Sequence, residues 1–314
     1  MTLTGDVDAR ARGTYRYVQI IMVVPAVWLL ASIAVVWIWR GELLDSISDY
    51  YGGPMRDVFV GGLMACGICM VAYKGRSNLE DYALNFAGLN AFFVALVPNS
   101  FPKLLADARK AEREGVDLPV SSAQLQENLQ IAVGVFLAVV LLFVVVDALL
   151  LWKRFDWRAQ STLANAAIVV SCAAEVVLLG FVVAMVVGVE EVNGGTIYTI
   201  AHFVAAALLI LNLSFVAATN AFGRLHKDAV VPSDVGAPPA LFRTVTVLMW
   251  AGIAVGGLAI WRGVDYAVIV TEIWEIVLFL VFWVAATRHE WTRSAAQAAA
   301  PRAQPAVGAV PQNS

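Results

Sequence analysis

Long apolar stretches recur along almost the whole chain, and this recurrence limits the possible folds more than any other feature. Stretches that could cross the roughly 30 Å hydrocarbon core of a bilayer lie near 17–39, 57–73, 83–98, 130–152, 163–188, 197–221, 240–261 and 266–287. In lipid only helices and closed barrels satisfy their backbone hydrogen bonds. The sequence therefore predicts an all-α, polytopic transmembrane bundle of about eight spans.

Composition excludes a water-soluble globule. Hydrophobic residues make up 60% of the chain and charged residues 14%, whereas soluble domains are nearer half apolar and a quarter charged. The net charge of −3 and the scattered basic residues argue against a nucleic-acid partner, because binding of that kind requires clustered positive charge. Nucleotide-binding, metalloprotease and nucleophile-elbow motifs are missing from the sequence, so we predict no cofactor and no metal.

The positions of Lys and Arg predict the orientation. If the N-terminus is cytoplasmic, fourteen of the 21 basic residues fall on the cytoplasmic side. Four of the other seven lie in segment 99–129, set back from the span ends where the charge rule is strongest. We therefore expect both termini to be cytoplasmic in a multi-pass protein of the inner cell membrane.

The chain divides into three predicted parts. Residues 1–16 form a cytoplasmic segment, residues 17–288 form the helical domain, and residues 289–314 form a disordered cytoplasmic tail rich in Ala and Pro. The first span is too long for a signal peptide and is expected to be an uncleaved anchor. External loop 99–129 contains a candidate helix, 103–114, and a Ser121-x-x-Gln124 capping pattern, and it is either a lid or a solvated connector.

Ionisable residues within the spans are the first candidates for function, because they are costly in hydrocarbon unless paired or hydrated. Glu272 and Glu275 are three residues apart and so share one face of the last span. Two carboxylates this close in low dielectric do not both ionise easily, so one could hold a proton and serve in a relay. Alternatively, both are structural and hydrogen-bond to neighbouring helices, for example to Asn85, Asn90, Asn212 or Asn220.

Two further polar residues have open interpretations. His202 is the single histidine predicted at membrane depth, and it is either a packing residue or a proton carrier. Glu175 follows the small residues 171–174, which would let another helix approach it, so it is either a structural residue or part of a proton relay with Glu275. Asp147 lies close enough to Lys153 to pair with it, which favours a structural role.

Two spaced motifs are interpreted as packing features. Cys66 and Cys69 lie three apart inside a span, where redox chemistry would lack water, and Cys172 is also in an apolar stretch, so no disulfide framework is predicted. Gly252-x-x-x-Gly256 in the seventh span permits close contact with another helix.

The most unusual segment, residues 46–62, joins the first two spans. Gly52, Gly53 and Pro54 favour a turn, and Arg56 beside Asp57 places a charge pair where the second helix begins. Either this is a binding site at the membrane surface, or it is a well-capped helix start with interfacial tyrosines.

The chain resembles an uncharacterised bacterial family of polytopic membrane proteins, similar to the DRAM, Frag and Sfk-like group of six-helix proteins. The resemblance rests on Ser46-Ile-Ser-x-Tyr50-Tyr51, Pro54-x-Arg56-Asp57-x-Phe59-Val60-Gly61, Tyr73-Lys74-Gly75, Asn85-Phe-Ala-Gly-Leu89, Val94-Ala-Leu-Val-Pro98, His202-x-x-x-Ala206 and Trp274-Glu275. It covers residues 46–98 and 200–286 and implies a role in lipid organisation or stress. Spans 130–152 and 163–188 are insertions relative to that pattern.

The resemblance places a candidate ligand site on the outer side of the membrane. Arg56 and the tyrosines would contact a lipid headgroup or small amphiphile, and His202 and Glu275 would form the buried floor. The full candidate set is Ser46, Ser48, Tyr50, Tyr51, Arg56, Asp57, His202, Glu272 and Glu275. Membrane lipids are the expected partners, and a homo-oligomer is left open.

Three functions follow from these candidates. The first is binding or organising lipid or a small amphiphile, since no complete catalytic set is present. The second is proton-coupled secondary transport, which would use Glu175 and Glu275. The third is an intramembrane lipid hydrolase that uses His202 with Asp57 or Glu275. The related alkaline ceramidase-like group uses several histidines that this chain lacks, so an enzyme is the weakest of the three.

Overall fold

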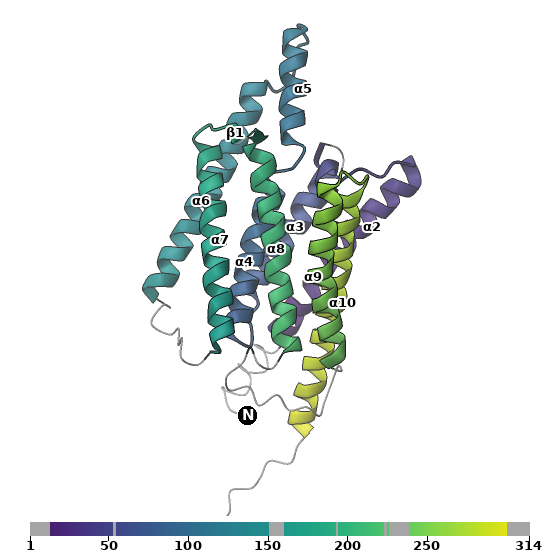
Figure 1. The fold of residues 1–314 in the computed structure, drawn as a ribbon, viewed down its shortest axis with the longest axis vertical. Helices are drawn as coiled ribbons and strands as arrows, with labels where there is room; N and C mark the ends of the chain where they lie inside the picture. Colours follow the sequence, from purple (N-terminus) through teal and green to yellow (C-terminus); the bar gives the residue numbers. More distant parts are fainter. Residues whose placement is uncertain are drawn as a thin grey trace, which may run out of the picture.

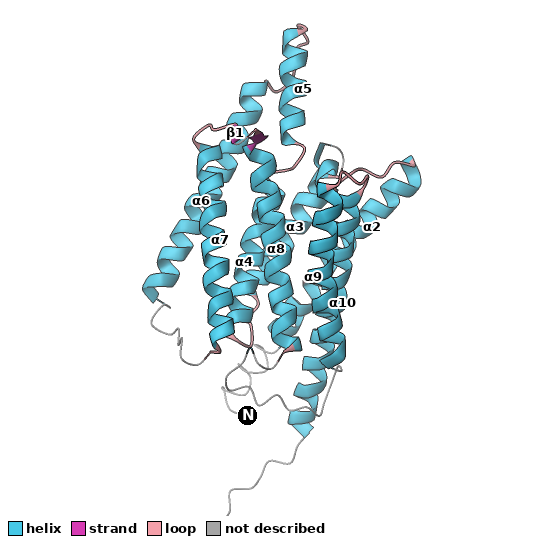
Figure 2. Ribbon diagram, in the orientation of Figure 1, coloured by secondary structure: helices cyan, strands magenta, loops and turns pink. Residues whose placement is uncertain are grey.

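The computed structural model describes residues 13–52, 55–150, 160–192, 194–222, 225 and 239–299, and almost all of them are helical (Figures 1 and 2). The long helices are α2 (Val23–Arg40), α3 (Arg56–Ala72), α4 (Asn78–Leu96), α6 (Ser122–Leu150), α7 (Thr162–Val186), α8 (Ile197–Ala221), α9 (Pro239–Trp261) and α10 (Ala267–Ala299). The short elements are η1 (Ile47–Gly52), α5 (Phe101–Arg113), β1 (Glu191–Val192) and β2 (Gly195–Thr196). Each predicted span corresponds to one long helix, which confirms the fold class.

Seven helices in the described part of the chain are long and apolar enough to cross a membrane. The eighth, α3, has 17 residues and is about 26 Å long, which is the lower limit for a span. The first span runs over Gly13–Arg40 and is interrupted by a turn at Met22. Pro25 explains this turn, because it lacks the N–H that would bond the carbonyl of Ile21.

Six helices form a closed ring, and two stand outside it. Around the ring each helix contacts the next in the order α2, α3, α4, α8, α9 and α10, and α10 returns to α2. Outside the ring, α7 packs against α4 and α8, and α6 packs against α7, as the left side of Figure 1 shows. The two outer helices correspond to the predicted spans 130–152 and 163–188.

Glycines set the closest approaches within the ring. A Cβ added to Gly67 of α3 would lie 2.9 Å from the carbonyl oxygen of Gly88 on α4, and one added to Gly88 would lie 2.7 Å from the Gly67 carbonyl oxygen. On α9, a Cβ added to Gly252 would lie 2.8 Å from Cδ1 of Trp274 on α10, and Gly256 similarly faces Thr271. The prediction that Gly252-x-x-x-Gly256 allows close helix contact is confirmed.

The first and last spans meet at one end of the bundle, called here the terminal end. Gln19 donates from Nε2 to Glu290 (2.8 Å) and accepts at Oε1 from the Trp291 indole (2.7 Å). Helix α10 continues to Ala299, so residues 289–299 are helical where a disordered tail was predicted. The Gln19 contacts hold the first of these turns, and the following Ala residues have high helix propensity. Residues 300–314 of the predicted tail lie outside the described residues.

The opposite end, called here the hairpin end, carries η1, α5 and the β1–β2 hairpin. Helix α5 stands clear of the bundle (Figure 2) and matches the predicted helix 103–114. The Ser121-x-x-Gln124 capping box is confirmed: Gln124 N–H bonds the Ser121 hydroxyl (3.1 Å) and the Gln124 side chain accepts from Ser121 N–H (3.0 Å). The hairpin pairs Glu191 with Thr196 and was not predicted.

Candidate functional site

The six-helix ring surrounds a cavity of about 120 Å³. Every ring helix and η1 contribute to its wall, which is apolar apart from two carboxyl side chains, Glu272 and Glu275. The wall residues are Pro25, Ala26, Leu29, Ile47, Phe59, Gly62, Leu63, Cys66, Met70, Ala91, Val94, Ala206, Leu209, Ile210, Leu213, Met249, Glu272, Glu275, Ile276 and Phe279. The prediction that the two carboxylates share one face of the last span is therefore confirmed.

Glu272 fastens η1 over the hairpin end of the cavity. Its carboxylate accepts from Ile47 N–H (2.7 Å) and from the Ser46 hydroxyl (3.0 Å). Since the Ser46 hydrogen is used by Glu272, the Ser48 hydroxyl donates to the Ser46 oxygen (3.0 Å). Ser46 and Ser48 are each 1% exposed, so both belong to the buried wall and not to an open surface.

Glu275 lies one turn further along α10 and has a different environment. The residue is 4% exposed, and neither carboxyl oxygen has a hydrogen-bond partner among the described residues. Its Oε1 rests against Gly252 of α9, where any side chain would overlap it. The Asn residues given as examples of partners bind neither carboxyl group: Glu272 binds Ser46 and Ile47, and Glu275 binds no described group.

The other residues of the predicted outer site are divided between the interior and the surface. Tyr50 is buried, and its hydroxyl accepts from Leu44 N–H (3.3 Å). Arg56 is exposed and lies over the ring of Tyr51, 4.8 Å from its centroid, with a hydrogen bond from Nη2 to the Tyr51 hydroxyl (3.2 Å). Asp57 is exposed. Of the predicted outer site, the side chains that gather at the cavity and its cap are those of Ser46, Ser48, Glu272 and Glu275.

His202 is bound elsewhere. Its Nδ1 lies 2.6 Å from the carbonyl oxygen of Val97, and because a carbonyl only accepts, Nδ1 carries the hydrogen and donates it. The side chain is 1% exposed and joins α8 to the end of α4. It forms no bond with a carboxylate in the described part of the chain, which is the contact that the hydrolase alternative requires.

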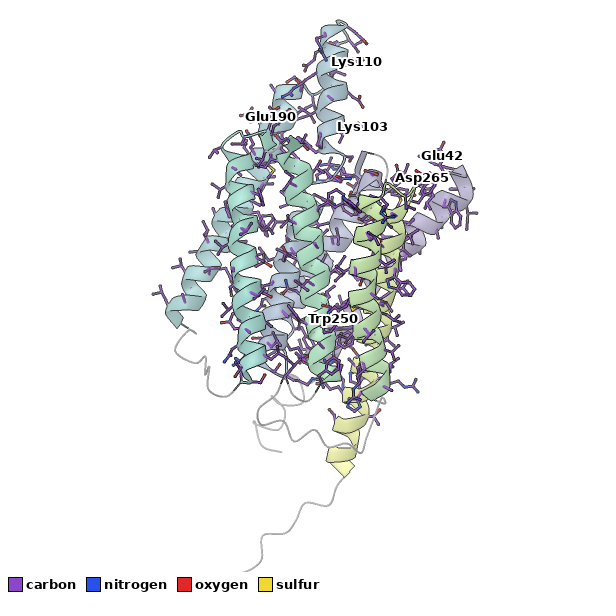
Figure 3. All side chains as sticks on the ribbon, viewed as in Figure 1. Glu42, Lys103, Lys110, Glu190, Trp250 and Asp265 are labelled. Atoms are coloured by element: carbon purple, nitrogen blue, oxygen red, sulfur yellow. The ribbon has the colours of Figure 1, made fainter. Side chains whose placement is uncertain are left out.

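A second pocket, of about 780 Å³, lies on the far side of η1 from the cavity. Ile47 of η1 faces the cavity, whereas Asp49 and Tyr50 line the outer pocket, so η1 separates the two spaces. The outer pocket contains four carboxylates against two cations, and Glu42 and Lys103 of this set are visible at the hairpin end in Figure 3. Burial, aided by the neighbouring charge of Asp45, raises the pKa of Asp49.

The described residues contain no cluster of three His, Cys, Asp or Glu side chains that could hold a metal. Sequence reasoning missed that Gly62 and Cys66 face the cavity, and it interpreted Cys66 only as a packing residue. The available signal was the run of small residues at 61, 62, 65, 66 and 67, which leaves space on α3 opposite the two carboxylates. Glu175 lies outside the cavity, bound by Asn90 and Asn212.

The geometry gives an apolar cavity with one bound and one unbound carboxyl group, closed at the hairpin end by a short helix. Comparison of the chain with known protein families, with curated proteins and with solved structures found no match.

Proposed function

We propose that this integral membrane protein binds a small amphiphile or the apolar part of a membrane lipid inside the six-helix ring, with Glu275 receiving a cationic or hydrogen-donating group of the ligand. The observation that carries the proposal is the Glu275 carboxyl group, which is buried in the cavity wall with both oxygens unbonded. An ionised carboxylate in such a place costs several kcal/mol unless a proton or a positively charged partner compensates it.

The cavity determines the size of the group that fits. Its volume of about 120 Å³ is close to that of an apolar protein cavity, roughly 150 Å³, that holds one benzene molecule. A single ring or a short alkyl segment is therefore the expected contents. The apolar wall favours such a group, and the Glu275 oxygens favour an ammonium or hydroxyl attached to it.

The route to the cavity passes η1. Glu272 holds this element by two hydrogen bonds, one from the Ser46 hydroxyl and one from Ile47 N–H, so the ligand enters when these bonds open. If the hairpin end faces outward, as the distribution of basic residues predicts, the ligand comes from the outer leaflet. The family resemblance, with its implied role in lipid organisation, agrees with such a ligand.

Matched ring compounds test the proposal on the purified protein in detergent. Benzylamine should raise the Tm of the wild type, benzyl alcohol should raise it less, and benzoate should not raise it, because only the ammonium compensates Glu275. Glu275→Gln should lose the preference for the amine. The control is Glu175→Gln, which changes the same residue type outside the cavity and should respond as the wild type does.

Two outcomes would count against this function. Equal stabilisation by benzylamine and benzoate would show that the carboxyl group does not recognise the ligand. An unchanged amine response in Glu275→Gln would place the binding site elsewhere. Native mass spectrometry of the purified protein adds an independent readout, in which a co-purified amphiphile should be present with wild type and Glu175→Gln and lost with Glu275→Gln.

Proton-coupled transport is the second candidate, favoured by the position of the cavity inside the ring and by a further buried carboxyl group, Glu175, behind the α4–α8 wall. The two functions differ in one measurement. A transporter in sealed vesicles moves benzylamine across the membrane when a pH gradient is applied, whereas a binding protein retains it without net movement.

A further inference from the structure

A polar cluster fastens α7 to the outside of the ring. Glu175 of α7 meets Asn90 of α4 and Asn212 of α8, and the three residues are 4%, 0% and 1% exposed. Glu175 is the middle residue of the buried stripe of α7, in which every other member is apolar or a serine. The stripe consists of Ala164, Ile168, Ser171, Glu175, Leu178, Val182 and Met185.

The hydrogen bonds fix how both amides are turned. Asn90 Nδ2 donates to the Phe86 carbonyl (2.9 Å) and to Glu175 Oε1 (2.6 Å). Asn212 Nδ2 donates to the Leu208 carbonyl (2.9 Å) and to the same Glu175 oxygen (3.4 Å). Turning either amide over would set its oxygen against a carbonyl oxygen, which cannot donate. All four amide hydrogens are therefore used.

This arrangement leaves acceptors without donors. Asn90 Oδ1, Asn212 Oδ1 and Glu175 Oε2 are buried and have no hydrogen-bond partner among the described residues. A hydrogen on Glu175 Oε2 would change both the number of hydrogen-bond donors and the charge of this cluster. It would supply the missing donor to an Asn Oδ1, and it would remove a charge from a site that contains no cation.

Among the described residues, no charged side chain acts on the Glu175 carboxyl group in place of this proton. The side chains of α4 and α8 that act on the Glu175 carboxyl are the two amides, and the titratable neighbour that interacts with it is Cys172 on α7 itself. On α6, Glu127 is exposed near the start of the helix, and the side chain of Asp147 lies outside the described residues.

We propose that Glu175, Asn90 and Asn212 form a site that binds one proton and thereby holds α7 against the ring. In the protonated state Oε1 accepts from both amides and Oε2–H donates to an Asn oxygen, so the contact is neutral and hydrogen-bonded. Loss of the proton leaves a buried carboxylate facing amide oxygens and weakens the docking of α7. This site is independent of the ligand proposed for the central cavity.

Glu175→Gln tests the site, because a glutamine has the hydrogen-bonding pattern of the protonated acid. Its oxygen accepts from both amides, and its NH₂ group donates to the Asn oxygens. The Tm of wild type in detergent should fall as pH rises above about 4.3, the unfolded pKa of a glutamate, and it should level off once the folded acid also loses its proton. This fall should be steeper than that of Glu175→Gln. The matched variant Glu275→Gln retains Glu175, so its Tm should still fall with pH more steeply than the Tm of Glu175→Gln.

Infrared spectroscopy gives a readout that a merely structural role would not produce. The carbonyl stretch of a protonated carboxyl group should be present at neutral pH in Glu275→Gln. In that same background it should be shifted by Glu175→Asp and lost with Glu175→Gln. If Glu175→Gln does not fold, the spectra of Glu275→Gln and Glu175→Asp still test the proposal. Absence of a band that responds to Glu175 would overturn it.

A metal cation is the competing occupant, because a carboxylate and two amide oxygens also suit a hard ion such as Na⁺. Replacing choline chloride with sodium chloride at constant ionic strength and pH separates the two. An equal Tm in both salts is expected for the proton site. Stabilisation of wild type by sodium that disappears in Glu175→Gln would overturn the proton assignment.

Discussion

Gly252 leaves the space in which the Glu275 carboxyl group lies. A Cβ at this position would overlap Glu275 Oε1 and would come within 2.8 Å of the Trp274 ring. Trp274 does not move easily, since its indole N–H is bonded to the Leu248 carbonyl (3.3 Å), so the unbonded Glu275 carboxyl group would have to give way. The glycine is therefore part of the site, although it makes no polar contact.

Gly252→Ala should destabilise the protein and displace Glu275. Overpacking of this kind costs about 1 to 3 kcal/mol, which should lower the Tm of the purified protein by several degrees. Gly257→Ala is the matched control, because nothing lies within 4 Å of its added Cβ, and its Tm should be unchanged or higher. Equal Tm values for the two variants would contradict the close packing of α9 on α10.

Sequence predicted the residue types of the site better than their partners. Helical spacing placed Glu272 and Glu275 on one face, and both line the cavity. The partner of Glu272, however, is Ser46, which is 226 residues away in sequence. A local pattern does not indicate which distant helix will be adjacent. The sequence therefore did not show that Asn90 and Asn212 bind Glu175, or that His202 binds the Val97 carbonyl.

At the scale of elements, α5 is held to the rest of the hairpin end by side chains at its surface. Glu190, just before β1, accepts two hydrogen bonds from Arg109 of α5 (2.9 and 3.2 Å) and one from Gln126 of α6 (3.0 Å). Glu112 of α5 accepts from the Ser122 hydroxyl of α6 (2.7 Å). The hydrogen bonds from Arg109 and Gln126 lower the pKa of Glu190, and those from Ser122 lower the pKa of Glu112.

These shifts predict that α5 loosens in acid. A carboxylate whose pKa is lower in the folded state adds stability above its unfolded pKa, about 4.3, and loses it as pH falls through the folded value. Hydrogen exchange of the α5 amides should therefore accelerate below about pH 4, after correction for intrinsic rates. The exposed Arg109–Glu190 pair contributes at most about 1 kcal/mol.

Two variants isolate the contribution of Glu190. Glu190→Gln should loosen α5 already at neutral pH and reduce the acid effect to the part that depends on Glu112. Glu114→Gln changes a carboxylate of the neighbouring segment whose pair with Lys110 is long (3.9 Å) and exposed, and it should behave as wild type. An acid response in Glu190→Gln as large as that of wild type would refute the assignment.

Elements with strong local signals were predicted well. The apolar period located each long helix, and the capping box located the start of α6. The β1–β2 hairpin was missed because two-residue strands carry no period. The end of α10 was missed because its first turn beyond the predicted span is held by Gln19, which is distant in sequence. The η1 cap depends similarly on Glu272, so only the turn-forming residues of that segment were visible in sequence.

At the scale of the whole molecule, the cavity belongs to the ring and not to the outer pair of helices. The described residues that line it come from the six ring helices and from η1. The outer helices α6 and α7 contribute none of them, and the proposed proton site joins α7 to the ring.

Closure of the ring depends on Gln19, which is 1% exposed. Its side chain bonds Glu290 and Trp291, and its carbonyl accepts from the Trp283 indole (2.8 Å). Gln19→Leu removes both side-chain bonds, which leaves the Trp291 N–H without its acceptor and leaves Glu290 with the longer bond from the Tyr73 hydroxyl (3.3 Å). We expect a loss of about 2 to 4 kcal/mol in the free energy of unfolding, measured by denaturant titration in detergent.

The control for this variant is Gln130→Leu on α6, outside the ring. Gln130 makes one weak hydrogen bond, from Nε2 to the Met185 carbonyl at 3.4 Å, so its loss should change the free energy of unfolding by less than about 1 kcal/mol. If the two variants lose equal stability, Gln19 has no special role in closing the ring.

The contact between the first and last helices also governs how the protein is made. Gln19 and Glu290 are separated by 271 residues, and a ribosome adding roughly 5 to 20 residues each second needs about 14 to 54 s to synthesise that length. During this time the N-terminal helix is already in the bilayer without its final neighbour, and Gln19 must be sheltered by lipid headgroups, water or an insertase. Biogenesis of this protein thus ends with the arrival of α10, and a chain cut short before it leaves an open arc with the cavity wall facing lipid.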